Sequence, residues 1–169
     1  MRSIQRSPLA IFLFLFLIGS TALPAPGIGE EAAMSPGFGV TIPDGYRSWQ
    51  VVAPSHRPDK DEVRVILGND IAMQAYRAKT LPFPDGSILA KLAWKRAQSP
   101  EFEQAFVPGD PQRIEFMVKD SKKYAATGGW GFGRFVDGQA ADAQQHGTCF
   151  PCHEARVKGN DFVFTRYAP

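Results

Sequence analysis

Cysteine is scarce in this chain. Its 169 residues include two cysteines, too few for a disulfide-stapled scaffold or for a zinc site made of four cysteines. Both belong to one run near the C-terminus, Cys149-Phe150-Pro151-Cys152-His153. The CxxCH spacing supplies two thiols for thioether bonds and an imidazole for an iron, so it predicts a covalently attached c-type haem with His153 as an axial ligand. The alternatives are a thioredoxin-like CxxC and half of a zinc site.

A long apolar run is also missing. The most apolar stretch covers residues 9–18, about half of the roughly 20 residues that a bilayer crossing needs. It follows Arg2 and Arg6 and precedes Ser20-Thr21-Ala22, which is the arrangement of a secretory signal peptide. We therefore expect residues 1–22 to be cleaved and the protein to be exported to the periplasm, since covalent haem is installed outside the cytoplasm. The alternative is an uncleaved N-terminal anchor.

An excess of one charge is absent too. The full chain has a formal net charge of +2, and removal of residues 1–22, which include two arginines and no acidic residue, leaves 17 basic and 17 acidic residues. Such a balance does not predict a nucleic-acid partner. The remainder of about 147 residues is enough for one domain that buries a core and a haem.

Turn residues organise the mature chain. Residues 23–41 are rich in proline, glycine and alanine and predict a flexible leader, and the turn signal Ile42-Pro43-Asp44-Gly45 opens a domain over residues 42–169. Predicted strands cover residues 49–53, 62–67, 87–95, 113–118 and 130–136. Predicted helices run from Asn69 or Asp70 to 78, from Asp120 or Ser121 to 124, and over 140–145. The fold class is therefore α+β, mainly β, with an antiparallel sheet of about five strands, short helices and a C-terminal CxxCH segment.

One strand carries a charge at its centre. Lys91 interrupts residues 87–94, which are otherwise apolar on both faces, as in a central strand. In one interpretation its stem packs while the ammonium reaches solvent. In the other the amine is buried, and desolvation lowers its pKa far enough to make it a nucleophile at neutral pH.

A second strand alternates in polarity. In residues 113–118, Arg113, Glu115 and Met117 share one face and the apolar residues share the other. If the polar face looks towards the haem, Glu115 is a candidate base and Met117 a candidate sixth ligand. The alternative is a solvated outer face.

Three further residues have side chains that could contact the haem or its iron. Arg64 interrupts a β-branched strand and is either a hydrogen-bond donor to an iron-bound ligand or a haem propionate, or a surface arginine. His56 follows Pro54-Ser55 in a predicted loop, and His146 lies just before the CxxCH run. We interpret both histidines as surface residues rather than ligands.

With these residues in place, the sequence resembles the cytochrome P-460 family, whose relatives include the cytochromes c′-beta. The resemblance covers about residues 42–169, and its specificity lies in the order of several short stretches. These are residues 43–49 (PDGYRSW), 84–91 (PDGSILAK), 116–121 (FMVKDS), 128–132 (GGWGF), the CxxCH run, and 161–166 (DFVFTR).

The resemblance implies roles for individual residues. In hydroxylamine-oxidising members a strand lysine is bonded to a haem meso carbon, and Lys91 matches that position. A distal glutamate that accepts protons matches Glu115, an arginine of the same pocket matches Arg64, and the proximal ligand matches His153. We therefore expect an exported homodimeric enzyme that oxidises hydroxylamine to nitrogen oxides, passes electrons to an unidentified periplasmic acceptor, and uses Glu115 as a base whose pKa is raised from about 4.3 towards 6 or 7.

Two other functions stay open. The c′-beta relatives have an apolar distal pocket, lack the lysine cross-link and bind diatomic gases without turnover, and Phe102, Phe106 and Phe116 near the predicted distal strands favour that role. The third function is electron transfer, which needs a sixth iron ligand, with Met117 or Met73 as the candidates.

Overall fold

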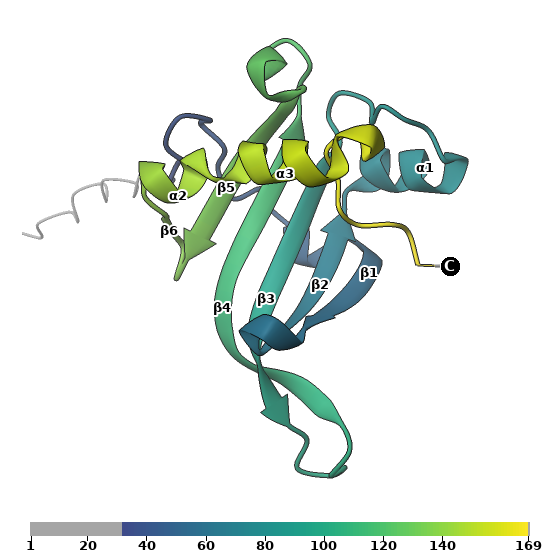
Figure 1. The fold of residues 1–169 in the computed structure, drawn as a ribbon, viewed down its shortest axis with the longest axis vertical. Helices are drawn as coiled ribbons and strands as arrows, with labels where there is room; N and C mark the ends of the chain where they lie inside the picture. Colours follow the sequence, from purple (N-terminus) through teal and green to yellow (C-terminus); the bar gives the residue numbers. More distant parts are fainter. Residues whose placement is uncertain (1–31, 169) are drawn as a thin grey trace, which may run out of the picture. The chain divides into compact units, whose positions relative to one another are not determined.

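The computed structural model describes residues 32–168, in which six strands form one antiparallel sheet. The strands are β1 (Gln50–Arg57), β2 (Glu62–Gly68), β3 (Ile88–Gln98), β4 (Phe106–Lys119), β5 (Trp130–Val136) and β6 (Gln139–Ala140). Each strand pairs with the one before it, as Figure 1 shows. The predicted mainly β, α+β fold is confirmed. The predicted signal peptide and residues 23–31 of the leader lie outside the described residues.

The helices are short. They are α1 (Asp70–Ala78), α2 (Ala143–Gly147) and α3 (Cys149–Val157), together with the 3-10 helices η1 (Tyr46–Ser48), η2 (Pro58–Lys60), η3 (Ala125–Thr127) and η4 (Lys158–Asn160). Across residues 32–168, none is long and apolar enough to span a bilayer. In Figure 1, α3 crosses one face of the sheet, and α1 lies near the end of β2.

All five predicted strands are present, but four are longer than predicted, β1 and β4 by the most. β1 continues beyond Ala53 through Pro54, which is possible because β1 is an edge strand, where proline is tolerated. β4 begins at Phe106 rather than Arg113, and the prolines in its first half coincide with shifts in the pairing register around Trp94. The sixth strand, β6, was not predicted.

Asn69 joins the start of helix α1 to the start of strand β3. Its Oδ1 accepts hydrogen bonds from Ala72 N and Ile88 N, both at 3.0 Å, and its Nδ2 donates to Gly86 O at 2.8 Å. The first of these bonds is an N-cap, so the predicted cap and helix are confirmed.

The other two predicted helices are only partly correct. The helix predicted over 140–145 begins at Ala143, because Ala140 pairs in β6 and Asp142 is the N-cap. The helix predicted to end at residue 124 is a single hydrogen-bonded turn, in which Asp120 O accepts from Tyr124 N at 3.0 Å. The chain then continues into η3.

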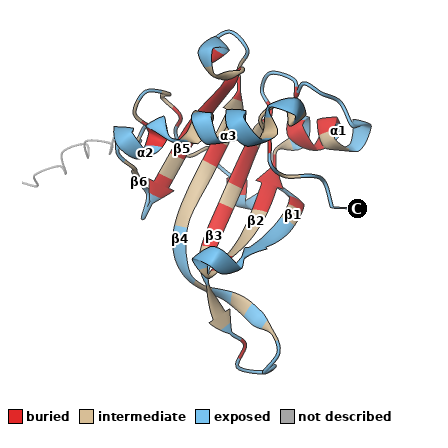
Figure 2. Ribbon diagram, in the orientation of Figure 1, coloured by how far each residue is buried: buried red, intermediate tan, exposed pale blue. Residues whose placement is uncertain are grey.

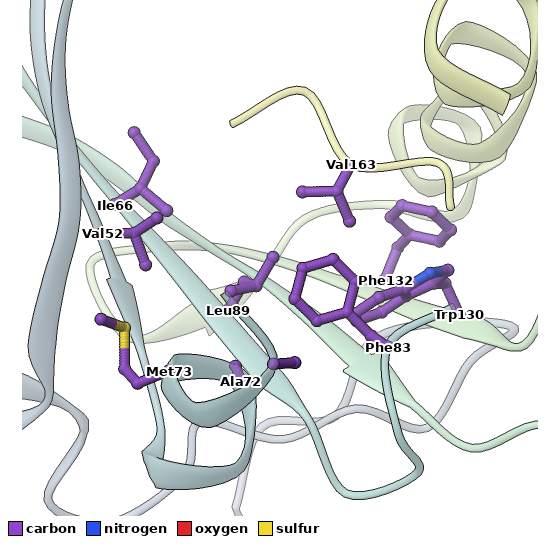
Figure 3. Close-up of a cluster of buried hydrophobic side chains, with 10 residues drawn as sticks. Val52, Ile66, Ala72, Met73, Phe83, Leu89, Trp130, Phe132 and Val163 are labelled. Carbon is purple, nitrogen blue, oxygen red and sulfur yellow. The ribbon is translucent and has the colours of Figure 1, made fainter. Parts of the chain in front are cut away.

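The sheet has an apolar cluster on each face, because alternate residues of a strand point to opposite sides. On the face covered by α1 and α3, Leu89, Trp130 and Phe132 pack with Met73 of α1 and Val163 of the C-terminal segment (Figure 3). The opposite face carries a second cluster, whose members include Val40, Tyr46, Leu92, Phe116 and Phe135. The buried residues along β2, β3 and β5 are visible in Figure 2.

The end of the predicted leader is packed against the sheet. Met34 and Thr41 form an isolated β-bridge, and Ser35 Oγ accepts a hydrogen bond from Val40 N at 2.9 Å. Val40 is 3% exposed and belongs to the second cluster. The folded unit therefore begins earlier than the predicted boundary at residue 42.

Candidate functional site

Lys91 and Glu115 form an ion pair at the centre of the sheet. The two residues stand opposite each other in the register of β3 and β4, so both side chains project from the same face. Lys91 Nζ contacts Glu115 Oε2, and the side chains are 28% and 15% exposed. Glu115 therefore does not lie on a solvated outer face, and Lys91 does not send its ammonium freely into solvent.

Two arginines complete the surroundings of Glu115. Arg134 is its partner on β5; Arg134 Nε donates to Glu115 Oε1 at 2.8 Å, and Arg134 Nη2 lies 2.6 Å from the same oxygen. Arg113 Nε lies 3.5 Å from Glu115 Oε2. Within the described part of the chain, Glu115 Oε2 and Arg113 Nε are buried atoms without a well-formed hydrogen bond. One carboxylate oxygen is thus held in place and the other has acceptor capacity left.

This environment sets the pKa of Glu115. Burial favours the neutral acid, but the positive charges of Lys91, Arg134 and Arg113 outweigh it and lower the pKa to about 2. The predicted upward shift is wrong, because it considered burial alone. For Lys91, burial outweighs the attraction of Glu115, and its pKa is lowered, in the predicted direction.

Arg64 lies beside this pair without touching it. Its Nε donates to Glu62 Oε1, and its side chain is 11% exposed, so the surface placement is excluded. Arg113 Nη2 also donates to Glu62, at 2.9 and 3.1 Å. Burial favours the neutral form of Glu62, but the two guanidinium groups lower its pKa. Arg64 is therefore engaged with a carboxylate that was not predicted to belong to the site.

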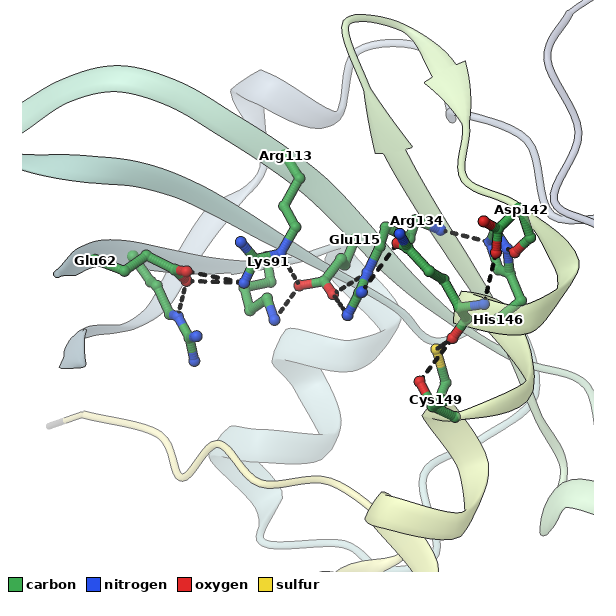
Figure 4. A network of polar contacts seen from close by, with 11 residues as sticks. Glu62, Lys91, Arg113, Glu115, Arg134, Asp142, His146 and Cys149 are labelled. Carbon is green, nitrogen blue, oxygen red and sulfur yellow. Dashed lines mark hydrogen bonds and ion pairs between the residues drawn. The ribbon is translucent and has the colours of Figure 1, made fainter. Parts of the chain in front are cut away.

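The charged side chains form a row across four strands. In Figure 4 the row runs from Glu62 through Arg113, Lys91 and Glu115 to Arg134, and it ends beside the segment that carries Cys149. Glu62 and Arg134 were not among the predicted site residues. Arg134 did carry a usable signal, because it interrupts an apolar strand just as Lys91 does. Glu62 is the first residue of its strand, so it interrupts no apolar run and carried no such signal.

The CxxCH run forms the start of helix α3. Cys149 and Cys152 are three residues apart on a helix and therefore share a face, and both are free thiols. Burial raises the pKa of Cys149. The pair can form two thioether bonds to one haem without a change of helix register.

His153 has one ring nitrogen occupied and the other available. Its Nδ1–H donates to the carbonyl oxygen of Phe162 at 2.7 Å, which leaves Nε2 as the atom for an iron. The rings of Phe132 and Phe164 pack against the imidazole, with centroids 5.0 and 4.9 Å away. Burial lowers the pKa of His153 and so favours the neutral imidazole that binds iron.

The row of charges and the helix face each other. The charges of Lys91 and Glu115 both act on the pKa of His153, and those of Arg134, Glu115 and Lys91 act on the pKa of Cys149. The two free thiols and the imidazole with one available nitrogen are the groups that a covalent haem needs. The residues therefore fit the cofactor that the sequence predicts.

His146 is buried, contrary to the prediction that it is a surface residue. It is 1% exposed, its Nε2 accepts from Arg134 N and its Nδ1–H donates to Asp142 O, each at 2.9 Å. Both ring nitrogens are engaged, so His146 anchors α2 to β5 rather than binding metal. His56 is exposed, as predicted.

The phenylalanines that favoured an apolar distal pocket lie elsewhere. Phe102 is 70% exposed, Phe106 is half exposed at the start of β4, and Phe116 is buried on the opposite face of the sheet. The two methionines proposed as sixth ligands, Met117 and Met73, both belong to the apolar cluster on the face covered by α1 and α3, and Met117 stands opposite Phe132 in the register of β4 and β5. The positions of the three phenylalanines remove the support that the sequence gave to an apolar distal pocket.

Comparison with known proteins agrees with this site. The family model described as Cytochrome P460 matches residues 43–165, which include Lys91, Glu115 and the CxxCH run. Among curated proteins no match was found. That family implies a covalently attached c-type haem, and the free thiols of Cys149 and Cys152 agree with it. The chain therefore belongs to the cytochrome P460 family of c-type haem proteins.

Proposed function

We propose that this protein oxidises hydroxylamine to nitrogen oxides such as nitric oxide or nitrous oxide. Cys149 and Cys152 would hold the haem, and His153 Nε2 would bind its iron. The observation that carries the proposal is the Lys91–Glu115 pair, a buried base beside a lysine, which faces the haem-attachment helix. An electron carrier would need neither group.

The haem, when bound, supplies a redox-active iron that takes electrons from a small nitrogen compound. Each electron removed from hydroxylamine is accompanied by a proton, so the site needs a proton acceptor. Glu115 is in position for this task, because Arg134 holds its Oε1 while its Oε2 has no well-formed hydrogen bond. Arg134 fixes Oε1, and Oε2, the oxygen beside Lys91 Nζ, would receive the proton.

The low pKa of Glu115 links its role to the state of Lys91. A carboxylate with a pKa of about 2 is a weak base, and the charge of Lys91 is the largest influence that opposes burial. A bond between the Lys91 nitrogen and the haem would remove the ammonium charge, and the pKa of Glu115 would then rise towards working pH. We therefore propose that the cross-link both alters the haem and activates the base.

A second function is favoured by the same low pKa. Without the cross-link, Glu115 stays ionised and accepts protons poorly, which suits reversible binding of nitric oxide or carbon monoxide without turnover. For either function we propose export to the periplasm and a homodimer. The oxidase also needs a periplasmic electron acceptor, which is still unidentified.

The experiment that separates the two functions is a measurement of mass and spectrum. The chain would be expressed with haem-attachment machinery, and its denatured intact mass and ferrous optical spectrum recorded. We expect a haem adduct with further loss of hydrogen and a broad, red-shifted Soret band, together with hydroxylamine turnover. An ordinary adduct with a normal high-spin c-type spectrum and no turnover would reject the oxidase and leave gas binding.

A further inference from the structure

The carbonyl group that orients His153 belongs to an unusual piece of backbone. Phe162 O accepts the His153 Nδ1–H bond, and Phe162 has a φ of 62°. Asp161 before it has a φ of 47°, so two consecutive residues with side chains adopt the left-handed conformation. This conformation is unfavourable for residues other than glycine, so the surroundings must hold it.

A buried ion pair fixes the first of these two residues. Lys119 Nζ donates to Asp161 Oδ1 and Oδ2 at 2.8 and 2.9 Å, and the two side chains are 6% and 8% exposed. Phe83 N donates to Asp161 Oδ2 at 2.8 Å, and Trp130 Nε1 donates to Asp161 O at 2.8 Å. The carboxylate and the carbonyl of Asp161 are therefore both held from the sheet side.

The second residue is fixed by a close approach to a glycine. The ring of Phe162 lies against Gly128, where an added Cβ would come within 2.2 Å of the ring. Gly128 O also accepts a hydrogen bond from Lys119 Nζ at 3.1 Å. Lys119 thus touches both the residue before Phe162 and the glycine on which its ring rests.

The geometry points to Lys119 and Asp161 as positioning residues for the iron ligand His153. By holding residues 161 and 162 in the left-handed conformation, the pair keeps the Phe162 carbonyl on His153 Nδ1–H. That bond makes Nε2 a stronger donor to the metal, which stabilises the oxidised iron relative to the reduced iron. The inference rests on the proposed haem ligation by His153, but it holds for an oxidase and for a gas-binding protein alike.

The test uses a variant that removes both charges of the pair. Lys119→Met combined with Asp161→Asn avoids a lone buried charge and keeps an acceptor for Phe83 N. In the haem-loaded protein we expect the Fe–His stretching band of the ferrous form, seen by resonance Raman spectroscopy, to fall in frequency. We also expect the ratio of reduced to oxidised protein at a fixed potential to rise about tenfold, which is about 59 mV for a one-electron couple.

A second variant perturbs the same backbone segment, residues 161 and 162, through a different hydrogen bond. Trp130→Phe keeps the aromatic packing but removes the donor to Asp161 O, and a smaller shift in the same direction is expected. The matched control is Asp85→Asn, a carboxylate that binds Ser121 N and Oγ at 2.8 and 2.7 Å in a neighbouring loop and does not touch residues 161 and 162. This control should move neither the band nor the potential.

The outcomes are distinguishable. An unchanged Fe–His band and potential in the folded double variant and in Trp130→Phe would overturn the positioning role. A shift as large in Asp85→Asn would overturn it as well, because the effect would then not be specific to the pair. A wild-type protein with no Fe–His band at all would instead reject ligation by His153, and with it the proposed function.

Discussion

Two lysine–carboxylate pairs each have one member on the same face of strand β4, and their carboxylates differ in burial and in hydrogen bonding. Glu115 at the middle of the strand pairs with Lys91, and Lys119 at its end pairs with Asp161. Asp161 is saturated by two bonds from Lys119 and one from a backbone N–H, and it is more deeply buried than Glu115. Glu115 has one oxygen, Oε2, without a well-formed hydrogen bond.

The difference suits the Lys119–Asp161 pair to a structural role and the Lys91–Glu115 pair to the reactive role that we propose for it. A buried carboxylate whose oxygens are fully bonded, like that of Asp161, resists movement, so it is suited to hold backbone in place. A carboxylate that an arginine fixes through one oxygen, and whose other oxygen has acceptor capacity left, can exchange protons without losing its position. Two lysine–carboxylate pairs that lie a few residues apart on one strand are therefore suited to different roles.

The largest expected effect is on turnover. Glu115→Gln keeps the shape of the side chain and removes its basicity, so hydroxylamine oxidation should fall by about 10²–10⁴-fold. Binding of hydroxylamine, followed by a spectral titration, should be retained. Asp161→Asn is the matched change in the other pair, and it should reduce turnover far less. Unchanged turnover in Glu115→Gln would remove this residue from the mechanism.

The next effect is on stability and should be larger in the structural pair. Lys119→Met leaves the Asp161 carboxylate buried without its cation, at a cost of about 3–5 kcal/mol in the free energy of unfolding. Lys91→Met should cost less, because Arg134 still holds Glu115 at 2.6 and 2.8 Å. Urea unfolding of both variants measures the difference. A greater loss in Lys91→Met would reverse the assignment of the two pairs.

A third effect concerns pH. The pKa of Glu115 is lowered to about 2 from its ordinary value, so the ionised group stabilises the folded state above about pH 4.5, and this stabilisation is lost as the pH falls towards 2. Before haem attachment, when Lys91 still carries its charge, the wild-type chain should therefore lose about 3 kcal/mol more than Glu115→Gln across that interval. The free energy of unfolding of both proteins, measured against pH, tests this. Parallel curves would mean that Glu115 is not held as an ion.

The smallest effect belongs to a third, exposed pair. Lys158 and Glu154 are 3.4 Å apart on the surface, with side chains 68% and 45% exposed. Lys158→Met should change the free energy of unfolding by at most about 0.5 kcal/mol, because solvent screens such a pair. A loss in the free energy of unfolding comparable to that of Lys119→Met would show that the stability gained from ion pairs near the C-terminus does not depend on their burial.

The sequence predicted the parts of this site that depend on local pattern. The CxxCH spacing, the charge inside the apolar strand of Lys91 and the shared face of Arg113, Glu115 and Met117 are all visible along one stretch of chain. The contacts of Arg134 and Glu62 depend on which residues stand opposite each other in neighbouring strands. That register is set by turns, bulges and the whole core, and no single strand reveals it.

The direction of the Glu115 pKa could not be predicted for the same reason. Burial alone raises the pKa of a carboxylate, and the opposite result required knowledge of three cations from three strands. The burial of His146 was missed because its two partners, Arg134 N and Asp142 O, are backbone groups that sequence patterns do not identify. The prolines in β1 and β4 likewise hid strand residues that the edge position and the register shifts accommodate.

The order of the strands has a consequence for how the protein matures. Because each strand pairs with the one made before it, the sheet can form progressively as the chain emerges. Every residue in the row from Glu62 to Arg134 precedes the two cysteines in the chain. The order of the chain therefore allows the row of charged side chains to be in place before the segment that is joined covalently to the cofactor has been made.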